Sequence, residues 1–346
     1  MTLHSTYKRA RKRFGKTAPG RWLKRILKAR REKARDRKEP PLFIVAESDE
    51  PGKPCGYFYT EWLAWTAQHD PDLHSRVRLN HLPTALSVKP AAFHAWIQDP
   101  VRERSESVFR QLEGLERSAR RRGANIIQPV AALSNSLRAE QFERLTRAGL
   151  RSPRVVQVDA DFANDLGGLS LPIVVREDWG HGKQMLRLDS RAEVVAWLDS
   201  LTPSTRRHVA VEYIETQSPD SYYRKYRYLL FGDRGVCRHL VFSPRWEVRP
   251  WDRVLTDDTI AEELRYVSGS CGAHEVFDLA RRELEFDIAA FDYSFDASGG
   301  IVVWEVNPYP DLSMPHGRAA EYLGESVERT YLALADFYRD RMALTR

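Results

Sequence analysis

Apolar runs separated by polar and glycine-containing breaks divide the first third of the chain into short strands and helices. β-Branched and aromatic runs predict strands, and apolar residues at helical spacing predict helices. The expected strands are residues 42–47, 92–97 and 124–128, and the expected helices are residues 56–68 and 99–122. Strands that alternate with helices in this way are typical of a small α/β lobe with a mainly parallel sheet.

The same pattern continues through the rest of the chain, with more strands and shorter connections. Ser190 and Glu193 have the spacing of a capping box, so a helix is expected to begin there. The expected helices are residues 134–148, 190–201 and 318–341, and the expected strands are residues 171–179, 184–188, 208–214, 226–231, 235–242, 286–295 and 301–306. Together these elements predict an α/β fold with α+β lobes, divided into residues 1–40, 41–133, 134–207 and 208–346.

The last two expected strands form a hairpin that carries three oxygen-bearing side chains. Glu305 and Asn307 are two residues apart and share one face of their strand, and Asp292 lies on the partner strand. Hard oxygen ligands of this kind suit Mg²⁺, which keeps several waters and is usually completed by substrate phosphates. The alternative is a hairpin with ordinary solvated acids.

The loop between these two strands decides whether Asp292 and Glu305 can meet. Directly opposed residues of an antiparallel pair share a face, and a loop over residues 296–300 would place Asp292 opposite Trp304. Glu305 would then point to the other face of the sheet. A shared metal site therefore requires a loop with an even number of residues, or a bulge that shifts the register by one. We predict that register.

A glycine-containing turn joins two short apolar strands over residues 171–188. The turn contains Gly180, His181, Gly182 and Lys183. Its backbone N–H groups could cradle phosphates, with Lys183 or His181 adding positive charge. The alternative is an ordinary turn, which is what most short glycine motifs are.

The order of these parts resembles the ATP-grasp superfamily, and within it the ribosomal-protein glutamate ligases and the glutathione synthetase-like peptide ligases. The resemblance covers about residues 124–311. Its parts, in chain order, are GANIIQP, SLRAEQFERLTRAGLRSPRV, LPIVVREDWGHGKQM, VAVEYIE, KYRYLLFGDRGV, and AAFDYSF followed by IVVWEVNPYP. The resemblance implies an ATP-grasp fold that holds the nucleotide between two lobes, after a small α/β lobe and a basic N-terminal arm.

The resemblance also implies roles for individual residues. Asp292, Glu305 and Asn307 are expected to hold Mg²⁺. Arg227 is expected to stabilise the phosphoryl group during transfer; it belongs to a family motif written Asp-x-Arg, although its aspartate position is Lys225 here. The residues expected to contact ATP are Gly180, His181, Gly182 and Lys183 over the phosphates, Glu212, Tyr213 and Ile214 beside adenine, and Glu215 beside the ribose hydroxyls.

Two positions depart from the family pattern. The family usually supplies two lysines to the nucleotide phosphates, and by spacing these positions are Arg138 and Arg176 here. Arginine keeps the positive charge and can bind phosphate through two hydrogen bonds, but its planar fork is longer than an ammonium group and differently shaped. ATP binding is therefore expected, with altered geometry. The alternative for Arg138 is a solvated helix residue.

The function that the resemblance implies is ligation of a carboxylate to an amine, which is an amino acid or peptide, through an acyl phosphate formed from ATP with Mg²⁺. Residues 222–227 and Arg245 could hold an anionic substrate, although aromatic and basic residues on neighbouring strands also pack with solvated tips. One alternative is an ATP-grasp kinase that phosphorylates a small-molecule hydroxyl, since it uses the same nucleotide motifs. The other is a catalytically degenerate nucleotide-binding protein.

The composition of the 346-residue chain limits its class. It has no apolar run long enough to span a membrane and no apolar segment near its start of the kind that directs secretion. Cys55, Cys237 and Cys271 show no metal-ligand spacing, so they are expected to be reduced thiols in a cytoplasmic protein. The ten histidines show no zinc-binding pattern. The sequence leaves the oligomeric state open, with a homodimer as one option.

Positive charge is concentrated at the start of the chain. Residues 1–40 contain 16 Lys and Arg against 3 Asp and Glu, a net charge of +13, whereas the whole chain carries +6. Trp22 and Leu23 with Ile26 and Leu27 have helical spacing in this leader, so it could form a basic amphipathic helix that docks on RNA, an anionic membrane or an acidic peptide. The alternative is a disordered or solubilising arm.

Overall fold

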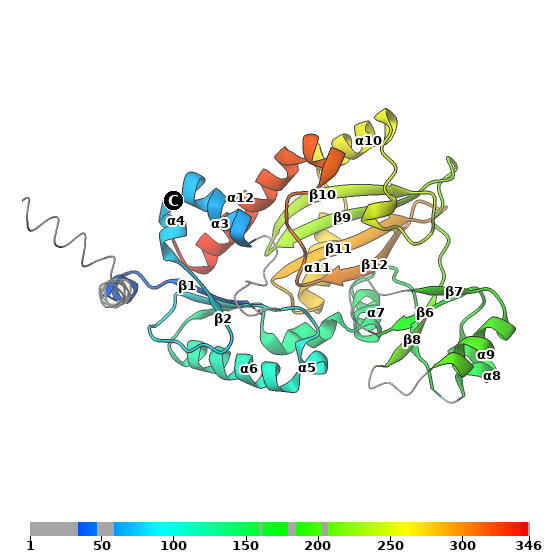
Figure 1. The fold of residues 1–346 in the computed structure, drawn as a ribbon, viewed down its shortest axis with the longest axis horizontal. Helices are drawn as coiled ribbons and strands as arrows, with labels where there is room; N and C mark the ends of the chain where they lie inside the picture. The colour runs from blue at the N-terminus through cyan, green and yellow to red at the C-terminus, as the bar shows by residue number, and fades with distance from the viewer. Residues whose placement is uncertain (1–33, 47–58, 160, 179–184, 202–206, 345–346) are drawn as a thin grey trace, which may run out of the picture.

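The computed structural model describes residues 34–46, 59–159, 161–178, 185–201 and 207–344 of the chain. In this part of the chain, three four-stranded sheets follow one another from the N-terminus to the C-terminus (Figure 1). Helices pack against the sheets, so the molecule has the mixed α/β architecture that the sequence predicts. None of the described helices is long and apolar enough to cross a membrane.

The first sheet is parallel, as predicted, and its strands lie in the order β2-β1-β3-β4. The elements of this region are β1 (Leu42–Ala46), α3 (Tyr59–His69), α4 (Pro71–Arg76), β2 (Val77–His81), β3 (Ala92–Trp96), α5 (Val101–Arg104), α6 (Glu106–Arg121) and β4 (Asn125–Ile127). The prediction of a single helix over residues 99–122 is wrong, because the segment forms two helices, α5 and α6. Ser105 has an extended backbone and its hydroxyl accepts a hydrogen bond from the Val108 N–H, so it separates α5 from α6.

The second sheet is antiparallel, in the order β5-β8-β6-β7. The elements of this region are η1 (Val130–Ser136), α7 (Arg138–Arg147), β5 (Val155–Gln157), α8 (Phe162–Asp165), η2 (Leu166–Gly168), β6 (Ile173–Glu177), β7 (Leu186–Leu188), α9 (Arg191–Ser200) and β8 (His208–Glu212). The capping box of Ser190 and Glu193 is confirmed at the start of α9. The helix expected over residues 134–148 begins only at Arg138, because Leu137 has a non-helical backbone that separates α7 from the 3-10 helix before it.

The third sheet is antiparallel, in the order β10-β9-β11-β12. The elements of this region are β9 (Tyr223–Phe231), β10 (Arg234–Ser243), η3 (Pro250–Asp252), α10 (Asp257–Ser268), α11 (His274–Glu283), β11 (Ile288–Phe295), β12 (Ile301–Asn307), η4 (Gly317–Glu321) and α12 (Gly324–Arg341). On β9, Leu229 and Phe231 pack in a hydrophobic core with α12, whereas Tyr228 and Leu230 pack on the other face with α11. The face of Leu229 continues along β9 with Arg227, so its far end is polar.

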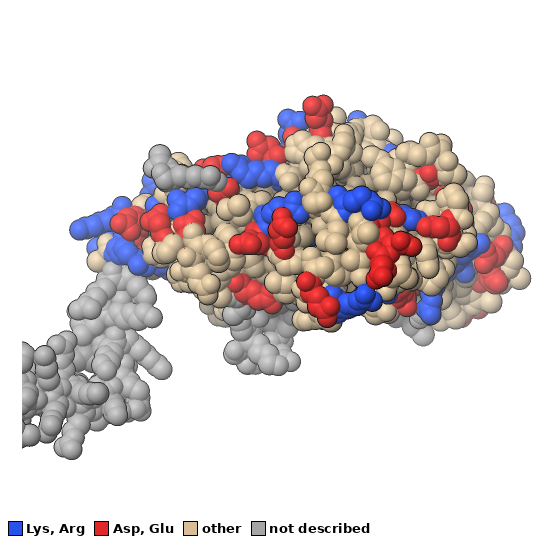
Figure 2. Space-filling view, turned by 90° about the horizontal axis from the view of Figure 1, so that it is seen from above, with Lys and Arg blue, Asp and Glu red and all other residues tan. Residues whose placement is uncertain are grey.

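The last residues of the predicted leader belong to the first lobe. Residues 1–33 lie outside the described part, but residues 34–38 are helical. The buried Asp36 carboxylate accepts hydrogen bonds from Arg78 on β2, at 3.1 Å from Nε and 2.5 Å from Nη2. Figure 2 shows Lys and Arg interspersed with Asp and Glu on one face of the molecule. On that face the two signs of charge are therefore mixed, and the excess of positive charge belongs to residues 1–40 of the sequence.

A buried histidine on β3 makes the stability of the fold depend on pH. His94 is fully buried, its Nδ1 lies 2.9 Å from the Tyr338 hydroxyl, and its ring lies edge-on to Trp96. Burial lowers the pKa of His94 to about 3. Below its ordinary pKa of about 6.5 the unfolded chain therefore takes up a proton at this position that the folded chain does not. Folding stability is lost as the pH falls through this window.

We expect the free energy of unfolding to fall by about 1.4 kcal/mol per pH unit on account of His94 alone between roughly pH 6 and pH 4. Urea denaturation of the native protein and of His94→Asn at several pH values measures this contribution. In the variant, the free energy of unfolding should fall less steeply with pH. The difference should correspond to one proton, or about 1.4 kcal/mol per pH unit. Equal slopes in the two proteins would contradict the assignment.

Candidate functional site

A bulge in β12 brings the two expected metal-binding carboxylates onto one face. Phe295 pairs with Ile301 and Tyr293 with Val303, as a five-residue loop requires, but the next pair is Asp292 with Glu305. The register therefore shifts by one between Tyr293 and Asp292, and Trp304 is the extra residue of β12. The predicted register is confirmed, through the bulge rather than through an even loop.

Asp292 is held by two cations of the neighbouring strand β9. Arg227 pairs with Asp292 in the sheet, and its Nε and Nη2 donate to the two carboxylate oxygens at 2.6 and 2.8 Å. The Lys225 ammonium lies 3.6 Å from Asp292 Oδ2. Burial alone would raise the pKa of Asp292, which is 5% exposed, but Arg227 and Lys225 outweigh it and lower that pKa well below its ordinary value. Asp292 is therefore ionised at neutral pH.

Glu305 is held by the first residue of α7. Arg138 Nη2 lies 2.7 Å from Glu305 Oε1. Arg138 is 8% exposed, so the alternative of a solvated helix residue is wrong. Its backbone N–H donates to the buried Asp178 carboxylate at 3.1 Å, which satisfies one of the free N–H groups at the start of the helix. Sequence spacing found Arg138, but its pairing with Glu305 depends on the tertiary fold.

Arg176 adds a second guanidinium beside Arg138. It lies on β6, where its Nε donates to the Glu177 carbonyl at 3.2 Å and its Nη1 contacts the Met185 sulfur at 3.4 Å. Burial, and then the charge of Arg138, lower the pKa of Arg176 to about 9. The group stays protonated at neutral pH. A buried cation and a partly buried one in the same cavity favour an anion between or beside them.

These residues line one cavity of about 380 Å³. Its charged lining comes from α7, from strands of the second and third sheets and from the segment that follows β10: Arg138, Arg176, Glu212, Lys225, Arg227, Glu247, Arg249, Asp292 and Glu305. Its apolar lining includes Val155, Val174, Met185, Val211 and Ile214. A cavity with apolar residues, five cationic side chains and four carboxylates in its lining suits a ligand that has a flat apolar part and an anionic part accompanied by a cation.

The segment expected beside adenine reaches this cavity through Glu212, Tyr213 and Ile214. The Glu212 carboxylate accepts a hydrogen bond from the backbone N–H of Arg154 at 3.0 Å. Glu215 is not part of the lining. Its carboxylate accepts from the Tyr213 hydroxyl at 3.0 Å and from two following backbone N–H groups, so its side chain orders this turn.

Two other expected site residues are not brought to the cavity lining. Arg245 is 71% exposed on its side chain and lies 3.8 Å from Asp252, so the geometry gives no support to a catalytic role. Asn307 is buried at the end of β12, where its Oδ1 accepts from the Tyr309 N–H at 2.7 Å. The glycine loop, residues 180–183, lies outside the described residues.

Sequence reasoning missed two contributors to this site. Trp246, Arg249 and Trp251 line the cavity from the segment that follows β10, which carries no recognised motif beyond its density of aromatic and basic residues. Gln141 binds the backbone of Val306 twice: its Oε1 accepts from the Val306 N–H at 3.0 Å, and its Nε2 donates to the Val306 carbonyl at 2.5 Å. Gln141 lies three residues after Arg138, so this contact fixes α7 against the strand that carries Glu305.

The donor set fits a divalent cation bound together with a phosphorylated ligand. Asp292 and Glu305 offer hard oxygen atoms from opposed positions, and Asn307 lies on the same strand face as Glu305. Within the described ranges, no group of three or more His, Cys, Asp or Glu side chains forms a complete metal site. Mg²⁺ typically binds through one or two carboxylates and completes its shell with waters and phosphate oxygens.

Among the comparisons with known proteins, the one with solved structures shows the fold. No protein-family model and no curated protein matches the sequence. Among solved structures, a D-alanine–D-alanine ligase from Bacillus anthracis complexed with ATP matches 88% of this chain and 97% of its own, with a TM-score of 0.55 and 12% identity. The ATP-grasp ligase PsnB complexed with the precursor peptide PsnA2 and AMPPNP matches 86% and 98%, with a TM-score of 0.52 and 12% identity. The VanG D-Ala:D-Ser ligase from Enterococcus faecalis matches 87% and 99%, with a TM-score of 0.54 and 10% identity.

Proposed function

Because this chain has the ATP-grasp fold, as its sequence resemblance predicts, we propose that it is an ATP-dependent ligase that joins a carboxylate to an amine through an acyl phosphate. The matching structures include ligases complexed with ATP and with AMPPNP. Identities of 10–12% carry the fold alone. The activity must therefore be argued from the side chains of this chain.

The observation that carries the proposal is the convergence of Asp292 and Glu305 beside cationic residues in one cavity. A one-residue bulge is required for that convergence, and β12 has it at Trp304. Bulges next to active sites re-aim side chains in this way. A purely structural hairpin would not need two opposed carboxylates, each held by its own guanidinium.

We propose that the cationic residues of the cavity bind the phosphates of ATP. Arg138 and Arg176 both line the cavity, and each offers several N–H donors. Ile214 and Val174 line its apolar part, where adenine can lie against the backbone of the strand end. We therefore assign the nucleotide to this cavity, with its phosphates towards Arg138 and Arg176 and its base towards Tyr213.

Asp292 and Glu305 would hold Mg²⁺, with Asn307 adding its amide oxygen from the same strand. When bound, the ion supplies Lewis-acid stabilisation of the charge on the transferring phosphoryl group. Arg227 and Arg138, which pair with these carboxylates here, would then be free to contact phosphate oxygens. The Asn307 oxygen already accepts one hydrogen bond and has a second lone pair for a ligand.

The chemistry needs no side-chain nucleophile. A carboxylate oxygen of the acid attacks the γ-phosphorus of ATP, the bond to the β-phosphate oxygen breaks, and ADP leaves with the bonding electrons. The amine then attacks the acyl carbon, the carbon–oxygen bond to phosphate breaks, and the amine proton passes to water. The work of the protein is to align the reactants and to stabilise negative charge through groups such as Arg227.

Trapping with hydroxylamine tests this function directly. The native enzyme is incubated with ATP, Mg²⁺, hydroxylamine and one acid at a time from a panel of amino acids, N-acetyl amino acids and dipeptides. Hydroxylamine takes the place of the amine substrate and attacks the acyl phosphate. A ligase that is given its acid substrate should therefore yield a hydroxamate and ADP in equal amounts. Omission of ATP or of the acid is the control.

Two results would contradict the ligase proposal. Absence of hydroxamate with every acid would remove it. A stable phosphorylated product from a panel of hydroxyl compounds, formed without hydroxamate, would favour the kinase alternative, because a phosphate ester does not react with hydroxylamine.

A further inference from the structure

A second bulge, in β10, lies at the same level of the third sheet as the bulge in β12. Cys237 pairs with Tyr228, but the next pair is His239 with Arg227, so Arg238 is the extra residue. Without this bulge Arg238 would lie opposite Arg227. With it, an imidazole takes that position in place of a second guanidinium.

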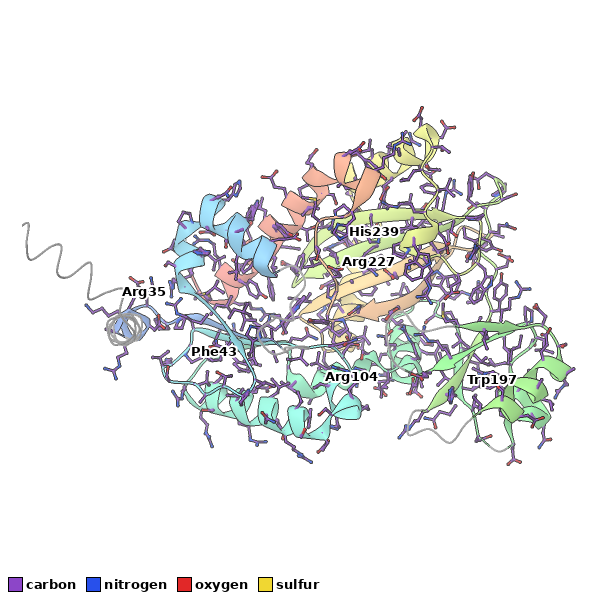
Figure 3. The ribbon with its side chains drawn as sticks, in the orientation of Figure 1. Arg35, Phe43, Arg104, Trp197, Arg227 and His239 are labelled. Atoms are coloured by element: carbon purple, nitrogen blue, oxygen red, sulfur yellow. The ribbon has the colours of Figure 1, made fainter. Side chains whose placement is uncertain are left out.

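The two bulges complete a row of polar side chains that crosses all four strands of the sheet. His239 on β10 is paired with Arg227 on β9, Arg227 with Asp292 on β11, and Asp292 with Glu305 on β12. Directly opposed residues share a face, with their Cβ atoms about 5 Å apart. Figure 3 shows His239 and Arg227 on adjacent strands. His239 is thus one strand beyond Arg227, on the side away from the two carboxylates.

Arg238, the residue that the bulge displaces, has a structural task. It is 4% exposed, and its Nη2 donates to the Ser313 carbonyl at 2.8 Å. Its own carbonyl accepts a hydrogen bond from Ser326 on α12 at 2.8 Å. Because of the bulge, Arg238 binds a backbone carbonyl, and His239 takes the position on β10 that is paired with Arg227.

The surroundings of His239 suit an anion. Its side chain is partly exposed and has no hydrogen bond with another described residue. It lies outside the lining of the 380 Å³ cavity but pairs across the sheet with Arg227, which belongs to that lining. The charged groups that act on it are Arg227 on β9, Arg238 on its own strand, Arg253 after η3 and Asp292 on β11. Burial, and then these three guanidiniums, lower the pKa of His239 well below its ordinary value. The imidazole is therefore neutral and has one N–H to donate.

An ammonium group would be repelled at this place, whereas a carboxylate would be attracted. Around His239, Arg227 is paired with Asp292 and Arg253 with Glu263 at 2.6 Å, whereas Arg238 donates to backbone carbonyls and adds a net positive charge. Phosphoryl transfer also requires that the attacking oxygen approach the phosphorus on the side opposite the leaving group. The row places His239 on the far side of Arg227 from the carboxylates that would hold the ion.

We propose that His239 and Arg227 form the subsite for the carboxylate of the acid substrate, with the His239 imidazole donating a hydrogen bond to one carboxylate oxygen. This inference rests on the proposed ligase function and specifies where its acid binds. During transfer the other oxygen forms the bond to the γ-phosphorus and ADP departs. His239 keeps its proton throughout, so it is a substrate-binding residue and not a general acid or base.

The experiment compares His239→Leu, which removes the donor, with His239→Gln, whose amide N–H₂ can replace the ring N–H. Hydroxamate formation is measured in the full chain, with the acid that the hydroxylamine panel selects, while acid and ATP are varied separately. His239→Leu should raise the KM for the acid by about tenfold to a hundredfold, as expected for loss of a hydrogen bond to a charged group. Its KM for ATP should stay within about twofold. His239→Gln should recover most of the loss.

A matched control is His274→Leu. The His274 Nδ1 lies 2.7 Å from the hydroxyl of Tyr228, a residue of the opposite face of the same sheet. This variant should leave the KM for the acid unchanged.

Three results would reject the subsite. They are a native KM for the acid in His239→Leu, a rise of its KM for the acid together with its KM for ATP, and a failure of His239→Gln to recover binding of the acid. If the native enzyme forms no hydroxamate with any acid, the ligase function itself fails and the subsite falls with it.

Discussion

Replacement of Glu305 by Gln should lower the rate of ADP formation by about three orders of magnitude, because the carboxylate that we propose as a Mg²⁺ ligand would contribute several kcal/mol of transition-state stabilisation through that ion. The fold should survive. Gln keeps a side-chain oxygen at the position of Glu305 Oε1, which lies 2.7 Å from Arg138 Nη2 here. Steady-state assays of ADP release and circular dichroism melting measure the two effects.

Glu140→Gln is the matched control for this variant. Glu140 lies on α7, two residues after Arg138, and pairs with Arg144 at 2.6 Å outside the cavity lining. Thermal shifts add a readout that does not depend on turnover: ATP with EDTA should stabilise both variants, whereas the further increment from Mg²⁺ should be lost in Glu305→Gln alone. Native turnover in Glu305→Gln would remove the metal assignment.

The hairpin that carries Asp292 and Glu305 was predictable because its rules are local. Strand alternation, loop length and the two-residue period show that Asp292 and Glu305 can share a face only if the register shifts by one, and the bulge at Trp304 provides that shift. Ser190 and Glu193 are likewise a local signal, and their capping box is present. The parallel order of the first sheet follows from alternation of strands with helices.

Pairings between distant segments were not predictable from one sequence. Arg138 binds Glu305, 167 positions later in the numbering, and nothing near either residue indicates the other. Arg245 looked as promising as Arg227 on charge alone, yet it faces solvent beside Asp252. The bulge at Arg238 has no local mark either, because its position depends on how β10 pairs with β9.

Helices α10 and α11 were missed for a different reason. Both lie between β10 and β11, and their apolar faces are short and interrupted by charge. α10 begins with a capping pair of Thr256 and Thr259, which is weaker as a sequence signal than one with Glu or Gln at the third position. Packing of Phe277 and Ala280 against the third sheet, which is a tertiary contact, stabilises α11.

The pair of Asp292 and Arg227 should be essential to function but replaceable for stability. Asp292→Leu leaves the Arg227 guanidinium without its carboxylate, and we expect it to lose about 3–5 kcal/mol of unfolding free energy. Arg227→Met should lose less, because Asp292 keeps the Lys225 ammonium at 3.6 Å. The double variant replaces both charges with apolar groups, and its stability should return to within about 1 kcal/mol of the native protein. Urea denaturation of the four proteins gives this double-mutant cycle.

Activity should follow the opposite pattern, with all three variants inactive in ADP release. Neither the carboxylate that we propose as a metal ligand nor the guanidinium that we propose as a phosphoryl contact can be replaced by an apolar side chain. The pH dependence supplies a second check. The pKa of Asp292 is lowered on folding, chiefly by Arg227 once burial is overcome, so its stabilisation is complete at neutral pH and declines as the pH falls below about 4. The loss of unfolding free energy caused by Asp292→Leu should therefore be smaller in acid.

A double variant that stays as unstable as the single variants would show that the pair is needed to build the sheet. A double variant that retains turnover would show that Asp292 and Arg227 take no part in phosphoryl transfer.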